Sequence, residues 1–189
     1  TPVITTSCIS LFSSITIGRA DGTGALTTDT ANFIDNVTLR AGVTTLAGLT
    51  TSQDNATITV NSSAGTDVTV SAAVTANGAG TVDINSGAGF TLNGGITLSS
   101  GTGAVTVDTT GANALAVNGS ITTGAAGTIT LTGTDAITMD ATSLVQADGA
   151  VQINGTETVT IDVVTSSSST VTIASTNASI VEADSTNTV

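Results

Sequence analysis

Carboxylates are the abundant reactive groups of this sequence, which has 14 Asp and Glu residues against two basic residues and no histidine. Asp83 and Asp108 fall on outward positions of neighbouring sequence repeats, so they form the one candidate for a glycosidase-like acid and base pair. Ser or Cys nucleophiles need an adjacent base, and the chain contains neither His nor Lys. Aromatic residues, which would hold a sugar, make up only 2%. The sequence therefore predicts a protein that is not an enzyme and has no catalytic residues.

The sequence gives as little evidence for a metal or cofactor site as for catalytic residues. Residues 21–24, Asp-Gly-Thr-Gly, are acidic but too few for an EF-hand loop and are typical of a turn. The chain also lacks the Gly-Gly-x-Gly-x-Asp repeat of calcium-binding β-rolls. We therefore expect no cofactor. A divalent cation bound at a junction between subunits is the alternative. Cys8 is the single cysteine, so we expect a buried thiol, with an intermolecular cross-link or a reactive thiol as the alternatives.

Modification of asparagine is the other chemistry that the residue types allow. Sequons of the form Asn-x-Ser/Thr are candidate N-glycosylation sites, although a chain so rich in Thr and Asn also produces them by chance. The candidates are Asn36, Asn55, Asn61, Asn118, Asn154 and Asn177.

The elements that would position these groups are short strands. A triplet of apolar, outward and apolar residues, such as Ile58-Thr59-Val60, has the period of two that is typical of a strand with one buried face. The triplet recurs about every 22 residues. Its first positions are Ile15, Val37, Ile58, Val82, Val105, Ile129, Val151 and Val171.

Two further sets of triplets repeat with the same period but a different phase, for example from Val68 and from Val74. Gly, Asn and Ser clusters separate them and are typical of tight corners. Asn-Gly corners also occur in antiparallel hairpins, so a sandwich is the structural alternative. The shared period favours an all-β fold with a single parallel β-helix, or β-solenoid, over residues 15–189. We expect about three short strands per coil and roughly seven to eight coils.

Composition agrees with a narrow core. Hydrophobic residues make up 39% of the chain, and most of them are aliphatic, as a thin layer of β-branched side chains requires. The formal net charge of -12 excludes nucleic acid and anionic membrane surfaces as partners. No apolar run is long enough for a membrane-spanning helix, so we expect no membrane insertion.

Residues 1–14 form an apolar segment without glycine ahead of the first repeat, which predicts an N-terminal cap or an arm that inserts into another subunit. The last coil ends without a polar capping helix, so its sheet edge is expected to be open. The candidate inter-subunit contacts at the two ends are Val3, Ile4, Ile9, Leu11, Phe12, Ile180 and Val181.

Strand units such as Gly127-Thr128-Ile129-Thr130-Leu131-Thr132-Gly133 and Gly80-Thr81-Val82-Asp83-Ile84 resemble the repeats of filamentous-haemagglutinin-type bacterial surface adhesins. The resemblance covers most of residues 15–189. It implies a parallel β-helix that forms a secreted or surface-displayed rod, and it supplies no catalytic residues. The chain is short and carries no secretion domain of that family, which leaves room for assembly from many small subunits.

The leading functional hypothesis is an extracellular structural protein, a subunit that stacks head to tail into a filament by strand addition, with itself as partner. Surface glycans are a further candidate partner. The alternatives are a stalk segment of a larger surface adhesin and, less favoured, an ice-binding protein. Ice binding is suggested by outward Thr pairs such as Thr57 with Thr59 and Thr128 with Thr130. Asp83 and Gln152 interrupt that array.

Overall fold

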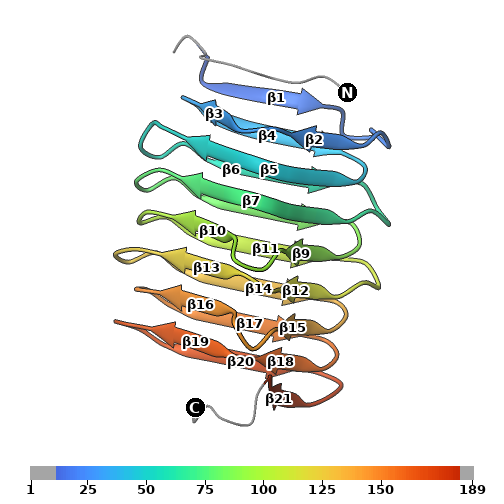
Figure 1. Ribbon diagram of the computed structural model, residues 1–189, viewed down its shortest axis with the longest axis vertical. Coiled ribbons are helices and arrows are strands. Elements are labelled where there is room, and N and C mark those ends of the chain that lie inside the picture. The colour runs from blue at the N-terminus through green and yellow to red at the C-terminus, as the bar shows by residue number, and fades with distance from the viewer. Residues whose placement is uncertain (1–11, 184–189) are drawn as a thin grey trace.

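The computed structural model describes residues 12–183. These residues form 21 strands joined by turns, and no helix occurs among them. All strand pairs are parallel, and each strand pairs with the equivalent strand of the next coil. Figure 1 shows the coils stacked along one axis, with β1 at one end and β20 and β21 at the other. This arrangement confirms the predicted parallel β-solenoid and excludes the antiparallel sandwich.

Three faces run along the solenoid. Face A is an eight-stranded sheet in chain order: β1 (Ser14–Gly18), β4 (Asn36–Ala41), β6 (Ile58–Ser62), β8 (Val82–Ser86), β11 (Val105–Thr109), β14 (Ile129–Gly133), β17 (Val151–Gly155) and β20 (Val171–Ser175). The eight strands correspond to eight coils, at the upper end of the range expected from the repeats.

Faces B and C belong to one 13-stranded sheet, because the long strands β5 (Thr44–Thr51) and β7 (Val68–Ala76) continue around the corner between them. Face B contains the first halves of those strands with β2 (Leu26–Thr28), β9 (Phe90–Leu92), β12 (Leu115–Val117), β15 (Ile137–Met139), β18 (Val159–Ile161) and β21 (Ile180–Glu182). Face C contains the second halves with β3 (Ala31–Phe33), β10 (Thr97–Ser100), β13 (Ser120–Thr123), β16 (Leu144–Ala147) and β19 (Val163–Ser166).

The core is a set of columns of aliphatic side chains that run along the solenoid axis. On face A, Val82 pairs with Ile58 on one side and Val105 on the other, and all three side chains are fully buried. The residue between two buried positions points outward, as Thr59 does between Ile58 and Val60. Since successive coils lie only about 4.8 Å apart, β-branched residues fill each layer without large aromatics.

Glycine allows the coils to approach closely at the corner that leads into face A. A Cβ atom on Gly103 would lie 2.1 Å from the carbonyl oxygen of Gly80 in the preceding coil, and a Cβ on Gly127 would lie 2.7 Å from that of Gly103. No side chain fits at these distances, so the repeated glycine sets the coil spacing at this corner.

Candidate interaction surfaces at the ends of the solenoid

The last coil leaves core positions uncovered. Val171 of β20 and Ile180 of β21 continue buried columns, through Val151 and Val159 respectively. Nevertheless, their side chains are 41% and 47% exposed. The reason is that each strand pairs with another on one side only within the described chain. Among residues 12–183 this end therefore presents an open sheet edge with apolar side chains on its inner rows.

The two candidate contacts at this end have different orientations. Ile180 follows the buried Val159 and belongs to an inward column. Val181 pairs with the outward-facing Thr160, so its side chain, 42% exposed, points away from the core. Ile180 is thus placed to contact a further coil stacked on this end, and Val181 is placed on its rim.

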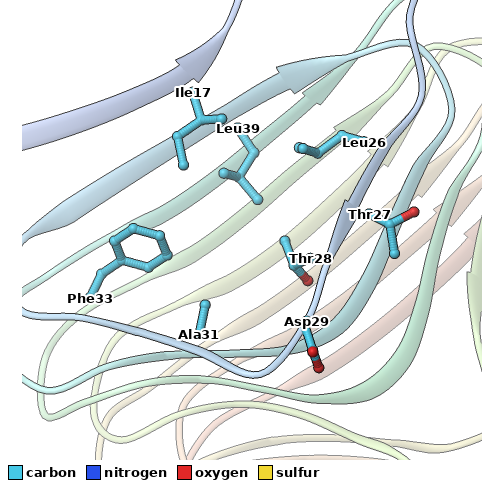
Figure 2. A pocket seen from close by; sticks show the side chains of 8 residues that line it. All are labelled: Ile17, Leu26, Thr27, Thr28, Asp29, Ala31, Phe33 and Leu39. Carbon is cyan, nitrogen blue, oxygen red and sulfur yellow. The ribbon is translucent and has the colours of Figure 1, made fainter. Parts of the chain in front are cut away.

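The first coil is open in a similar way. Ile15, Ile17 and Leu26 occupy inward columns and are only half-buried. A shallow hollow with room for about one water molecule lies beside them. Figure 2 shows the side chains that line it: Ile17, Leu26, Thr27, Thr28, Asp29, Ala31, Phe33 and Leu39.

The predicted N-terminal contacts fall mostly outside the described residues, namely Val3, Ile4, Ile9 and Leu11, together with Cys8. Phe12 is described and is 62% exposed, the largest exposed aromatic surface in the described range. Strand β1 begins at Ser14, one residue before the expected start of the solenoid at residue 15. The division into an arm and a solenoid remains a prediction.

The stacking of Asp83 on Asp108 that the sequence suggested is wrong. Asp83 pairs with Thr106 of the next coil, whereas Asp108 pairs with Asn85. The two carboxylates are therefore offset by two residues along the strands and lie in different outward rows. The inward apolar columns set the register, so the row of an acidic residue depends on its distance from the first buried residue of its strand.

Carboxylates instead connect neighbouring coils at the corners. Asp148 accepts a hydrogen bond from the Ser167 hydroxyl of the next coil and another, 2.8 Å long, from the Ala126 backbone N–H of the preceding coil. These bonds, the one from Ser167 foremost, hold the pKa of Asp148 below its ordinary value because they stabilise the ionised form. Within the described chain no group of three or more His, Cys, Asp or Glu side chains could hold a metal ion.

The six sequons differ in how accessible their amides are. The Asn36 Nδ2 donates to the Ser13 carbonyl at 3.1 Å while its Oδ1 accepts the Thr57 N–H at 2.7 Å. Asn55 lies exposed in a turn with a φ of 67°, and Asn177 is also exposed. The remaining three are half-buried, namely Asn61, Asn118 and Asn154. Glycosylation of these asparagines stays a prediction.

A polar hollow of about 310 Å³ lies at the corner between faces C and A in the first two coils. Its lining offers carboxylate and amide groups, the kind that bind hydroxyl-rich or cationic molecules. It is formed by Ser13, Asp35, Asn36, Gln53, Asp54, Asn55 and Ala56. Part of this set is already used, because Asp54 accepts from the Asn77 amide at 3.3 Å. Surface glycans as ligands stay a prediction.

The outward central row of face A is rich in threonine but broken. Asp83 stands between Thr59 and Thr106, and Gln152 stands between Thr130 and Thr172. The Thr57 and Thr81 hydroxyls in the neighbouring row are hydrogen-bonded to each other at 3.1 Å. The face thus offers a hydroxyl-rich surface in which the regular Thr pairs do not continue from coil to coil.

No protein-family model matches the chain, and no curated protein or solved structure is significantly similar to it. The fold alone therefore defines the class: the chain is a β-solenoid repeat protein built of parallel, stacked coils. No helix in the described range is long and apolar enough to cross a membrane.

Proposed function

We propose that this protein is an extracellular structural subunit that stacks head to tail into a filament. The observation that carries the proposal is the match between the two open ends. The inward columns that end in Val171, Ile173 and Ile180 begin with Ile15, Ile17 and Leu26, so a stacked second copy would place an aliphatic residue against an aliphatic residue in each column.

The backbone at the ends favours the same contact. The exposed sides of β20 and β21 offer N–H and C=O groups in the arrangement that every interior strand uses for its neighbour. A first coil placed on the last coil would satisfy them by parallel strand addition. Such a contact joins different surfaces of two copies and does not close on itself, so it propagates into a fibre. Eight coils give a repeat of about 35 to 40 Å per subunit.

The two edge strands of face A also lack two of the features that prevent strand addition. The residues of β1 and β20 include no charged side chain and no proline. Natural edge strands that must stay unpaired are usually protected by such residues or by a bulge. This absence supports an edge that takes part in assembly.

The alternative is a stalk segment of a larger surface adhesin, in which further coils of the same polypeptide would cover these ends. The same columns support both proposals. A filament subunit should polymerise by itself, whereas an isolated stalk segment should stay monomeric. An ice-binding role is the least favoured, because Asp83 and Gln152 break the threonine row. A secreted or cell-surface location is supported by the hydroxyl-rich outer faces and by the resemblance to adhesin repeats.

The test is electron microscopy and sedimentation of the full chain at pH 7.5 and pH 5, alongside Val171→Lys and Ile180→Lys. Both substitutions place a charge in the open columns, so they should abolish filaments. Thr106→Lys is the control for an added charge, because Thr106 points outward from β11, a strand in the middle of face A that is paired on both sides. It should leave filaments intact. Rods of about 35 to 40 Å under both conditions in the unchanged protein would contradict the filament and favour the stalk.

A further inference from the structure

One core column carries polar residues only at its two ends. It runs along face B, and its six central members are apolar and buried. In order, the column consists of Thr28, Leu46, Val70, Leu92, Val117, Met139, Ile161 and Glu182. Since Glu182 pairs with the inward-facing Ile161, it falls on the inward column at the open end, where its side chain is exposed.

We propose that Glu182 controls the stacking of a second copy on this end, so that filaments form only when its carboxylate is protonated. This inference rests on the proposed head-to-tail assembly. A charged residue that points inward on an edge strand is one of the known means by which proteins keep an edge from pairing.

The register of the solenoid determines what Glu182 would meet. Continuation of the face B column places it against Thr28 of the second copy, beside the hollow lined by Phe33 and Leu39. An ionised carboxylate enclosed there would lose its hydration without gaining a cation, which is far more unfavourable than burial of the neutral acid. The Thr28 hydroxyl, whose oxygen accepts the Ala47 N–H at 3.1 Å, still has a proton to donate to the neutral acid.

The surrounding charges act in the same direction. Asp162 follows Ile161 on the strand that packs against β21, and Asp29 follows Thr28 on the incoming coil. Glu157 lies at the opposite end of β18 from Asp162. Arg19, on the first coil, is paired with Asp21 at 2.7 Å in the loop before β2, and Arg40 points outward from face A. The described charges that flank the Glu182 column at this junction, Asp162 and Asp29, are therefore negative and oppose an ionised Glu182.

The simple alternative is that Glu182 is polar because the end of the column is exposed to water. In that case neutralising Glu182 would change assembly no more than neutralising any other surface carboxylate. Glu157→Gln is the matched control, because it makes the same change of charge at an exposed glutamate one corner away. The Asn177 amide at 3.4 Å from Glu157 can still donate to a glutamine oxygen.

The experiment measures the critical concentration for polymerisation by light scattering and sedimentation from pH 7.5 to pH 5.0, which stays above the pI of about 4.1. Electron microscopy checks that the scattering comes from filaments. We expect the unchanged protein and Glu157→Gln to polymerise only as the pH falls. Glu182→Gln should polymerise at pH 7.5 with a critical concentration at least about tenfold lower, and with little dependence on pH. Adding Val171→Lys to Glu182→Gln should abolish this assembly.

Equal curves for Glu182→Gln and Glu157→Gln would overturn the role of Glu182. Full assembly of the unchanged protein at pH 7.5 would also overturn the role of Glu182, but it would agree with the proposed head-to-tail filament. If none of the variants polymerises at any pH, the proposed filament fails as well. Thermal unfolding of each variant checks that the solenoid is intact.

Discussion

Asp67 in the third coil and Asn113 in the fifth coil are hydrogen-bonded to each other, with 3.0 Å between Oδ1 and Nδ2, although 46 residues separate them. The same Asp67 oxygen accepts the backbone N–H of Gly89, in the coil between them, at 2.8 Å. One carboxylate therefore joins three successive coils at a corner. In a solenoid each coil otherwise contacts mainly its nearest neighbours, so a contact that skips a coil couples their unfolding.

We predict that Asp67→Ala lowers the free energy of unfolding by about 1 to 2 kcal/mol, because it removes two charge-assisted bonds and leaves the Gly89 N–H without its acceptor. Asn113→Ala removes only one of the bonds and should have about half that effect. Urea unfolding followed by circular dichroism measures both. Equal effects of the two substitutions would show that the Gly89 bond contributes nothing.

Asp148 predicts a dependence of stability on pH. Its hydrogen bonds lower the pKa in the folded state, so its contribution is complete above the unfolded value of about 3.9 and is lost as the pH falls through the lowered value. The melting temperature of Asp148→Asn should therefore be below that of the unchanged protein at pH 7, and the difference should shrink as the pH falls below about 3.9.

Ser167→Ala is the companion variant, because it removes the strongest cause of the lowered pKa and leaves the Ala126 bond. Its pH dependence should lie between those of the unchanged protein and Asp148→Asn. A melting-temperature difference for Asp148→Asn that stays constant from pH 7 to pH 2 would contradict the mechanism.

At the corner that leads into face A, the addition of one methyl group to a glycine should lower stability markedly. Gly103→Ala should destabilise the solenoid by about 1 to 3 kcal/mol, because its Cβ would lie 2.1 Å from the Gly80 carbonyl oxygen and the coils would have to separate. Gly24→Ala is the control, since no atom lies within 4 Å of its Cβ position, and it should change stability by less than about 0.5 kcal/mol. Denaturant unfolding of the pair tests this, and similar values for both would exclude close packing as the reason for the glycine.

The core also contains a buried hydroxyl group that makes no hydrogen bond within the described chain. Thr109 Oγ1 is buried and has no hydrogen-bond partner among the described residues. We predict that Thr109→Val keeps or raises stability, by up to about 1 kcal/mol, since the shape is retained and an unpaired polar atom is removed. Ser100→Ala should do the opposite, with a loss of about 1 to 2 kcal/mol, because the buried Ser100 hydroxyl donates to the Gly80 carbonyl at 2.6 Å. A loss of stability in Thr109→Val as large as in Ser100→Ala would mean that Thr109 has a partner in solution.

The strands were predictable because the repeat is local and regular. Val82, Val105 and Ile129 were expected to stack from their spacing alone, and they pair in that register. The error over Asp83 and Asp108 could have been avoided from the same spacing, because Asp83 follows Val82 by one position, whereas Asp108 follows the equivalent Val105 by three. The inward place of Glu182 could likewise have been read by aligning Ile180-Val181-Glu182 with Val159-Thr160-Ile161.

What the sequence determined by itself was the solenoid, since alternation decides which side chains are buried and the common period decides which strands are neighbours. The tertiary structure decided what happens at corners and ends. Corner turns differ in length and conformation, so the bond from Asp67 to Asn113 depends on how successive turns overlie in space. The exposure of Val171 and Ile180 depends on whether another coil covers them, which no local pattern records.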